Sequence, residues 1–239
     1  MGLRSIFFDL DDTLCDDSGS WHQCAAATAA LAVQRVPNLD ADAVARYFLT
    51  HSDSYWRTLD PTRETRAILE IRTDHWAVTL AAFGQADRAF AEDLAQDYGY
   101  RRSTQIALFP DALPLLSALR SAGKTLVLIT NGLQSTHLER IAFLGLESYF
   151  DHTLISDALG LSKPDPRIFQ RALELSGCKP HEAAMVGDSL LNDVAGAQAV
   201  GIPAYWFNPY GRLFPPGIPA PIGGEVRSLK DLRLLFLPS

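Results

Sequence analysis

Cysteine is scarce in this sequence, and its pattern excludes two kinds of site. The three cysteines, Cys15, Cys24 and Cys178, lack the Cys-x-x-Cys or His spacing of a zinc site. Their odd number also argues against a disulfide framework, so they are expected to be reduced, buried thiols. Apolar runs are short as well: each is interrupted before the roughly 18 residues that a membrane helix needs.

Positive charge is also limited. Lys and Arg number 21 against 28 Asp and Glu, which gives a net charge of −7, and no basic run occurs along the chain. Because binding to a nucleic acid polymer depends on clustered Lys and Arg, we expect no such partner. The first residues carry neither a signal-peptide pattern nor a myristoylation pattern. These features predict a cytoplasmic protein that binds neither nucleic acid nor membrane.

Short apolar runs alternate with amphipathic segments at the start and in the second half of the chain. Helix signals between the runs include Asp165 as a cap before Pro166, and a segment that runs from Leu190 to Val200. The alternation predicts an α/β fold with a Rossmann-like parallel sheet core and helices on both faces. Five runs of four to six residues are the expected strands, namely Ser5–Leu10, Thr125–Thr130, Thr153–Ser156, Ala183–Gly187 and Ala204–Phe207.

Residues 16–105 contain no run that resembles a strand. Four Ala-rich, charged and periodic segments predict helices instead, at 25–34, 41–51, 63–83 and 88–98. We therefore expect an all-helical domain at 16–105. It would be inserted after the first strand of a core domain that consists of residues 1–15 and 106–239.

Carboxylates follow two of the expected strands. Asp9 and Asp11 come after the first strand, and Asp188 and Asp193 after the fourth. Because reactive groups gather beyond the carboxyl ends of parallel strands, these acids are expected to share one crevice. Two like charges about 4 Å apart cost about 4 kcal/mol at an effective dielectric constant of about 20, so the cluster requires a cation. Oxygen ligands without His or Cys favour Mg²⁺, although any one Asp alone fits a helix cap or a turn.

Lys163 is one of only four lysines among the 21 basic residues, and it precedes an expected helix beside the same crevice. A cation next to carboxylates is what an anionic ligand such as phosphate requires. The Thr130 hydroxyl and the backbone N–H groups of Asn131 and Gly132 would add phosphate contacts at a strand-to-helix turn. The simpler alternatives are a solvated lysine and a strand-end hydroxyl.

Four motif segments follow one another along the chain, namely Phe8–Leu14, Ile129–Gly132, Lys163–Phe169 and Val186–Asp193. In this order they resemble the motifs of the haloacid dehalogenase superfamily, and the helical insertion resembles its small helical cap domain. Residues 72–76 and 126–132 are further similar to the N-acylneuraminate-9-phosphatase branch and to its neighbours, the house-cleaning 5′-nucleotidases.

This resemblance implies a magnesium-dependent phosphoric monoester hydrolase acting on a small molecule, a sugar phosphate or a nucleotide. Asp9 would be the nucleophile that becomes an aspartyl phosphate, and Asp11 would serve as acid and then as base. Lys163 and Thr130 would hold the phosphoryl oxygens. The implied Mg²⁺ ligands are Asp9, the Asp11 carbonyl and Asp188, with Asp193 in support.

The cap is expected to set specificity, because it would close over the crevice and touch the unreactive part of the substrate. Arg72 and Arg102 are candidates for contacting a polar or acidic leaving group, with His75 and Trp76 behind them. A solvated helix face for Arg72 and a core position for Trp76 are equally simple interpretations.

Three alternatives use the same scaffold. A 2-haloacid dehalogenase would keep Asp9 but needs no acid at Asp11, because its leaving group takes no proton. A phosphomutase would use both acids and exclude water. A non-catalytic binding or regulatory protein would usually lack one motif acid, and all are present here. The physiological ester and the oligomeric state stay open.

Overall fold

The computed structural model describes residues 2–59, 63–217 and 220–237. The chain divides into two compact units. The first combines the segments 1–16 and 107–239, and the second is the continuous segment 17–106. The first unit holds all the strands of the sheet, and the second is helical.

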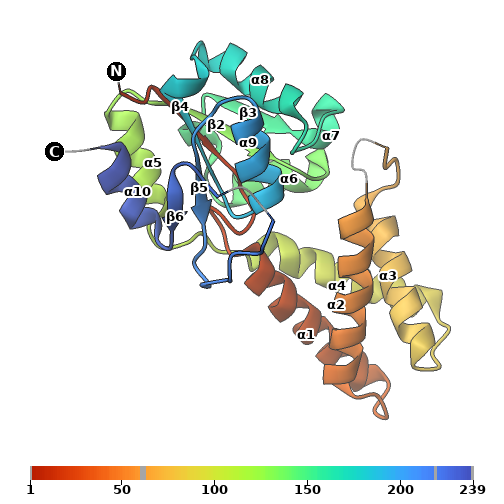
Figure 1. Ribbon diagram of the computed structural model, residues 1–239. Helices are drawn as coiled ribbons and strands as arrows, with labels where there is room; N and C mark the ends of the chain where they lie inside the picture. The colour runs from red at the N-terminus through yellow and green to blue at the C-terminus, as the bar shows by residue number, and fades with distance from the viewer. Residues whose placement is uncertain (1, 60–62, 218–219, 238–239) are drawn as a thin grey trace. The chain divides into compact units, whose positions relative to one another are not determined.

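The first unit is built on a six-stranded sheet in which every neighbouring pair is parallel (Figure 1). The strand order β3-β2-β1-β4-β5-β6 places β1 at the centre, between β2 and β4. All five expected strands are present, and a short sixth strand extends the edge next to β5. The strands are β1 (Ser5–Phe8), β2 (Thr125–Thr130), β3 (His152–Ile155), β4 (Ala183–Gly187), β5 (Ala204–Phe207) and β6 (Gly224–Val226).

The central strands are mostly apolar, as expected where helices cover both faces of a sheet. On one face, Phe7 and Val127 pack with Ile168 and Phe169 of α8. On the other side of the sheet, α5 and α10 lie next to each other (Figure 1). The α/β prediction is therefore confirmed. The helices of this unit are α5 (Ala112–Ser121), α6 (Gln134–Phe143), α7 (Ser156–Leu159), α8 (Pro166–Ser176), α9 (Gly196–Ala199) and α10 (Leu229–Phe236).

Two helix predictions in this unit have different outcomes. Asp165 does cap α8, since its side chain accepts a hydrogen bond from the Arg167 N–H, and Pro166 occupies the first turn. The single helix expected from Leu190 to Val200 is wrong in detail. It is divided into a π-helical turn at Leu190–Ala195 and the short helix α9, and such π-turns are frequent at functional sites.

The described residues of the second unit form four helices, which pack around Phe48, Trp76, Leu94 and Tyr98. The expected segments each lie on one of them, but some boundaries were wrong. The third helix begins only at Ile68, because the Glu64 side chain accepts the Arg66 N–H and closes a turn there. The helices are α1 (Asp17–Arg35), α2 (Ala41–Thr58), α3 (Ile68–Ala82) and α4 (Arg88–Thr104).

Two further expectations concern the cysteines and the membrane. All three cysteines are free; Cys15 and Cys24 are buried, whereas Cys178 is only partly so, contrary to expectation. Within the part of the chain that the structure describes, no helix combines the length and the apolar character that crossing a bilayer requires.

Candidate active site

The carboxyl end of β1 presents the first two acids. The Asp9 backbone N–H donates to the Val186 carbonyl at 3.0 Å, which continues the sheet by one residue. Its buried side chain accepts a hydrogen bond from the Thr13 hydroxyl at 3.1 Å. Asp12 then adopts a φ of 58°, and the Leu14 N–H donates to the Leu10 carbonyl at 2.9 Å. This left-handed turn, which Asp tolerates better than most residues, lets the chain leave the sheet beyond Asp9.

Lys163 lies between two of the carboxylates. Its Nζ is 2.6 Å from Asp9 Oδ1 and 2.6 Å from Asp193 Oδ1, and all three side chains are buried. Asn131 holds the lysine backbone from both sides: its Oδ1 accepts the Lys163 N–H, and its Nδ2 donates to the Lys163 carbonyl, each at 2.8 Å. The second motif thereby fixes the lysine of the third.

The carboxyl end of β4 supplies the remaining acids. Asp193 Oδ2 accepts the Ser189 N–H at 3.0 Å, so both of its oxygens are engaged. Gly187 makes this arrangement possible, because a Cβ there would lie 2.3 Å from Asp193 Cγ. Asp188 accepts hydrogen bonds from Arg212 Nη2 on its Oδ2 and on its carbonyl, both at 3.0 Å.

One group of acids could hold a metal ion. Carboxylate oxygens of Asp9, Asp188 and Asp193 all lie within 4.8 Å of one another. Burial raises the pKa of Asp9 well above its usual value, against the opposing effect of Lys163. Burial and then the Asp193 charge raise the pKa of Asp188 to about 7. A hard divalent cation fits this set of oxygen ligands.

Asp11 differs from the other acids, because its carboxylate meets two side chains of α6. Arg140 Nη1 donates to Oδ1, and His137 Nε2 lies 3.2 Å from Oδ2. Burial alone would raise the pKa of Asp11, but Arg140 and His137 outweigh it and hold the pKa far below its usual value. The Asp11 carboxylate is therefore ionised in this arrangement.

The other expected phosphate contacts have the following positions. Thr130 ends β2 and is almost fully buried. The Gly132 N–H donates to Ser156 Oγ at 2.9 Å, so this group already has a partner within the protein. Asn131 uses its side chain to hold Lys163, as described above.

Four functional candidates were not found by the sequence analysis: His137, Arg140, Asn208 and Arg212. The first two are three residues apart on α6, a spacing that places side chains on one helix face. Buried Asn208 accepts the Arg212 N–H at 2.8 Å and donates to the Arg212 carbonyl at 2.9 Å, which fixes the loop that carries Arg212. A helix-face search after the second motif could have found the first pair, whereas the loop gave no signal.

The specificity candidates all belong to the helical unit. His75 is buried with its Nδ1 3.1 Å from Ser52 Oγ, and burial lowers its pKa to about 4. Trp76 is fully buried and stacks on Phe48 with a centroid distance of 4.2 Å. The Arg72 guanidinium lies over the Tyr98 ring. His75 and Trp76 thus pack in the interior of this unit.

Arg102 is also an interior residue of the helical unit. It donates to Asp17 Oδ1 at 2.5 Å and to Ser20 Oγ at 3.0 Å, and so joins α4 to the start of α1. Its side chain is 8% exposed. These contacts give Arg102 a structural role, and its role toward a substrate stays a prediction.

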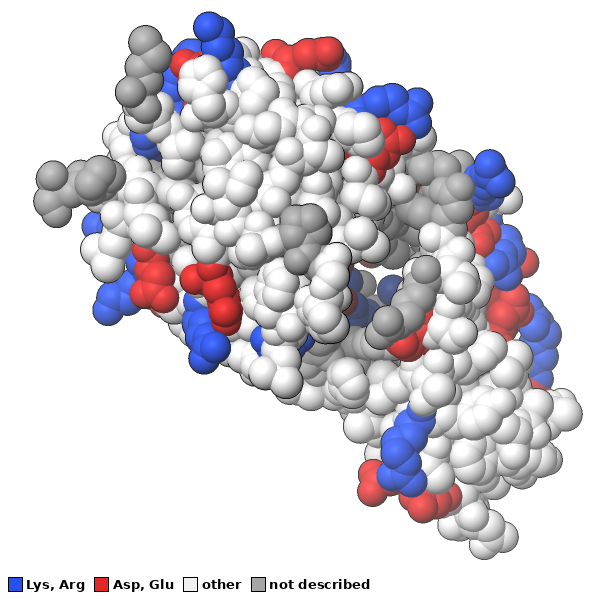
Figure 2. All heavy atoms as spheres, viewed as in Figure 1, with Lys and Arg blue, Asp and Glu red and all other residues white. Residues whose placement is uncertain are grey.

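Charges on the surface contrast with those of the site. On the face drawn in Figure 2, the described basic side chains are scattered and many lie beside acidic ones. Arg167 forms an ion pair with Asp165, and Arg227 forms one with Glu225. Pairs as exposed as these contribute little to stability. The charges that bear on chemistry lie in the interior, at the ends of β1 and β4.

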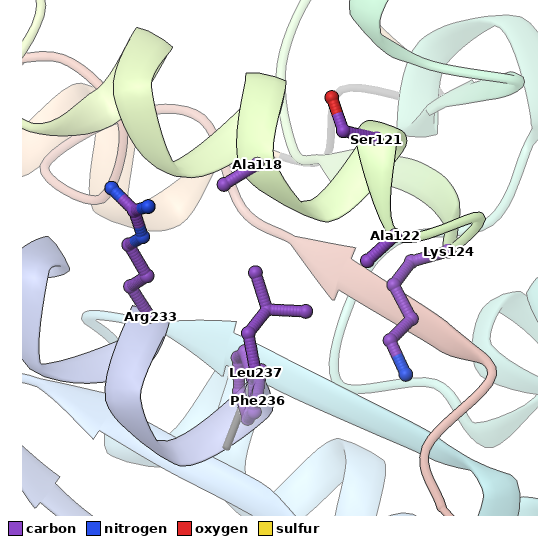
Figure 3. Close-up of a pocket in the computed structure, with 7 residues that line it drawn as sticks. All are labelled: Ala118, Ser121, Ala122, Lys124, Arg233, Phe236 and Leu237. Carbon is purple, nitrogen blue, oxygen red and sulfur yellow. The ribbon is translucent and has the colours of Figure 1, made fainter. Parts of the chain in front are cut away.

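A surface pocket of about 630 Å³ lies between α5 and α10 (Figure 3). Lys124, one of its lining residues, directly precedes β2, so this pocket is at the amino ends of the strands, opposite the acids. Lys124 and Arg233 stand on different sides of the pocket and do not converge (Figure 3). The Lys124 ammonium donates to the Leu3 carbonyl at 2.5 Å. The pocket therefore presents no grouped reactive side chains.

The sequence is similar to those of known proteins. A model of the haloacid dehalogenase-like hydrolases matches residues 3–201. A glyceraldehyde 3-phosphate phosphatase of Pyrococcus furiosus is 32% identical over 236 residues, which cover 99% of this chain and 90% of the relative. The N-acylneuraminate-9-phosphatase of Mus musculus is 31% identical over 219 residues, which cover 89% and 87%.

Solved structures are similar over nearly the whole chain. The HAD hydrolase YfnB of Bacillus subtilis, crystallised with magnesium, has a TM-score of 0.74 at 26% identity and covers 99% of this chain and 100% of its own. A 2-haloacid dehalogenase of Pseudomonas syringae has a TM-score of 0.64 at 28% identity and covers 96% of each chain.

Proposed function

This chain belongs to the haloacid dehalogenase-like hydrolase family, and the curated relatives named above are phosphatases. We propose that it hydrolyses a small phosphate monoester with Mg²⁺, through an aspartyl phosphate. It is a phosphoric monoester hydrolase, and the substrate class we propose is a sugar phosphate or a nucleotide. The helical unit would serve as its cap domain.

The observation that carries this proposal is the buried Lys163 ammonium between Asp9 and Asp193, with Asp188 in the same group. Uncatalysed hydrolysis of phosphate monoesters is among the slowest reactions known, and catalysis depends on positioning and charge neutralisation. Here Asp9 is the carboxylate nucleophile, and Lys163 and the candidate metal site lie next to it. Together they supply the positioning and the charge neutralisation. Lys163 and Thr130 would contact the phosphoryl oxygens.

The metal would be held by Asp9, the Asp11 carbonyl and Asp188, with Asp193 in support. The fit rests on the oxygen-only ligand set and on the closeness of the Asp9, Asp188 and Asp193 carboxylates, whose oxygens lie within 4.8 Å of one another. When bound, Mg²⁺ would neutralise charge on the phosphoryl group and orient it.

In the first half-reaction, an Asp9 oxygen attacks phosphorus and the bond from phosphorus to the ester oxygen breaks. Asp11 gives its proton to the departing alkoxide. In the second half-reaction, Asp11 takes a proton from water, which attacks the phosphoryl group and releases Asp9 and inorganic phosphate. Asp11 as it stands is ionised, which is the form that the second half-reaction needs; the first requires it to be protonated.

A substrate screen tests the proposed function. The purified chain, with and without Mg²⁺, would be assayed for phosphate release from sugar phosphates, nucleoside monophosphates, acyl sugar phosphates and an aryl phosphate. We expect Mg²⁺-dependent turnover of at least one small ester. Halide release from 2-haloacids without phosphate release would favour the dehalogenase, transfer of phosphate to a second hydroxyl would favour the mutase, and inactivity in all assays would favour a binding protein.

Binding of Mg²⁺ is expected to depend on pH through Asp188. Its pKa of about 7, raised from 3.8, means that protonated Asp188 stabilises the metal-free fold fully below 3.8, and that this stabilisation is lost as the pH rises through about 7. Because Mg²⁺ needs the ionised form, its affinity should rise about tenfold per pH unit up to pH 7 and then level off.

Isothermal titration of Mg²⁺ into the protein at pH 5.5, 6.5, 7.5 and 8.5 measures this dependence. The Asp188→Asn variant is the matched control and should lose most of the affinity together with the part of the pH dependence that Asp188 supplies; Asp9, whose pKa is also raised, supplies the remainder. An affinity in the wild type that stays constant over these pH values would contradict the assignment of Asp188 as a ligand.

Measurements on the Arg102→Ala variant distinguish a role of Arg102 in substrate specificity from a structural role. In the structure it pairs with Asp17 in the interior of the helical unit. Because the variant loses charge-assisted hydrogen bonds to Asp17, which is 22% exposed, Arg102→Ala should lower the free energy of unfolding by about 2 kcal/mol. A specificity role predicts in addition a larger loss of kcat/KM for the physiological ester than for an aryl phosphate. Equal losses for both substrates would remove Arg102 from the specificity residues.

A further inference from the structure

Both oxygens of the Asp11 carboxylate are held by one helix. Arg140 donates to Oδ1, and His137 Nε2 lies 3.2 Å from Oδ2. The His137 side chain is buried at 7% exposed, and the Arg140 side chain is partly buried at 12% exposed. Two contacts on different oxygens fix the plane of a carboxylate, which a single contact would leave free to rotate.

The His137 ring is fixed at its other end as well. Its Nδ1 lies 3.1 Å from the Leu133 carbonyl, one turn earlier in the chain. The ring therefore spans the distance from the start of α6 to Asp11. Its orientation is determined by the helix backbone and does not depend on a bound ligand.

Gly132 makes room for this ring. A Cβ at Gly132 would lie 2.0 Å from His137 Cε1 and 2.7 Å from His137 Nδ1, and the residue has a φ of +153°. Any side chain here would therefore push the ring away from Asp11. Glycine is therefore required at position 132 to leave room for the His137 ring, apart from the phosphate contact expected of its N–H group.

We propose that His137 and Arg140 are positioning residues, which orient the Asp11 carboxyl toward the leaving group and the attacking water. The proposal rests on the proposed phosphatase function. Neither residue needs to touch the substrate, because each acts through Asp11. A displacement of about 1 Å in a catalytic group can cost about 100-fold in rate. Loss of the fixed orientation of Asp11 should therefore produce a measurable loss of reaction rate.

The test uses two substrates with different leaving groups. An alkyl phosphate such as glycerol phosphate releases a poor leaving group that needs the proton from Asp11, whereas p-nitrophenyl phosphate releases a good one that does not. Rapid mixing of each with the Mg²⁺-loaded protein measures formation of the phosphoenzyme separately from its hydrolysis. The variants are His137→Ala and Arg140→Ala, with Glu139→Ala, an exposed residue of the same helix, as the control.

Removal of His137 or Arg140 lets the pKa of Asp11 rise toward its usual value, which favours the protonated form, so a loss of rate reports lost orientation and not lost protonation. We expect the formation rate with the alkyl phosphate to fall about 10- to 100-fold in both variants, and that with p-nitrophenyl phosphate by less than about threefold. KM should change little, and Arg140→Lys should recover part of the loss. Because His137 is buried, His137→Gln provides a second variant that keeps a side-chain N–H, and thermal melting checks that each variant is folded.

Equal losses for the two substrates in folded variants would overturn the positioning role and leave the phosphatase function intact. The same would follow if Glu139→Ala matched the two variants. Wild-type protein without activity on either ester would instead overturn the proposed function, and the positioning role with it.

Discussion

The Asp9→Asn variant is expected to lose hydrolysis of every phosphate ester, by about 10⁴-fold or more in kcat. An amide is a far weaker nucleophile than a carboxylate, and no other described acid occupies the position between Lys163 and Thr13. Phosphate release from an aryl phosphate measures the effect. Mass spectrometry of acid-quenched wild type should detect one added phosphoryl group, which the variant should lack.

The same variant should be folded, and at least as stable as the wild type without metal. Burial raises the pKa of Asp9, so the fold disfavours the charged form that an Asn side chain avoids. The Asn amide group can still accept a hydrogen bond from Lys163 and donate one to the Thr13 hydroxyl. We therefore expect the Asp9→Asn variant to be inactive and to have a melting temperature equal to or higher than that of the metal-free wild type. Turnover that survives in a folded variant would exclude Asp9 as the nucleophile.

Lys163→Met is expected to have the second largest effect, because it removes the buried ammonium shared by Asp9 and Asp193. Removing one partner from a buried ion pair costs about 3–5 kcal/mol of unfolding free energy. Loss of a preorganised cation at the phosphoryl group should also lower kcat/KM by about 10²- to 10³-fold. Urea unfolding at pH 8 and aryl phosphate assays measure the two losses.

The stability loss should depend on pH in a defined direction. Without the ammonium, the pKa of Asp9 should rise further above 3.8, so the stability provided by its protonated form is lost as the pH increases. Lys163→Met should therefore be closer to the wild type at pH 5 than at pH 8. Lys230→Met, which changes an exposed lysine, is the control and should have no effect. A loss of equal size at both pH values would contradict this account.

Much of the fold could be predicted from the sequence, because burial on both faces leaves an unmistakable pattern. The strands β1 and β4 are entirely buried, and their apolar runs stand out between polar segments. The short edge strand β6 is only partly buried and has no such run. The π-helical turn at Leu190–Ala195 was missed because its apolar spacing is close to that of an ordinary helix.

Some residues of the candidate site could be predicted from the sequence, and others could not. Asp9, Asp188 and Asp193 were predicted to converge because they follow strands of a parallel sheet, and the structure brings their oxygens together. Arg140 and Arg212 could not be separated from the other arginines by sequence, since exposed and functional arginines have the same local pattern. Their contacts with Asp11 and Asp188 depend on where α6 and the loop after β5 come to lie.

The sequence by itself determined the class of sheet, the helical insertion and the acids at the strand ends, because these follow from local periodicity and from the direction of parallel strands. Only the tertiary structure decided how the charges are paired. In the tertiary structure Lys163 lies between Asp9 and Asp193. The His137 ring contacts Asp11 and lies where a side chain at position 132 would otherwise be. Such pairings join residues far apart in the chain, and their energies depend on burial and distance, which no local pattern encodes.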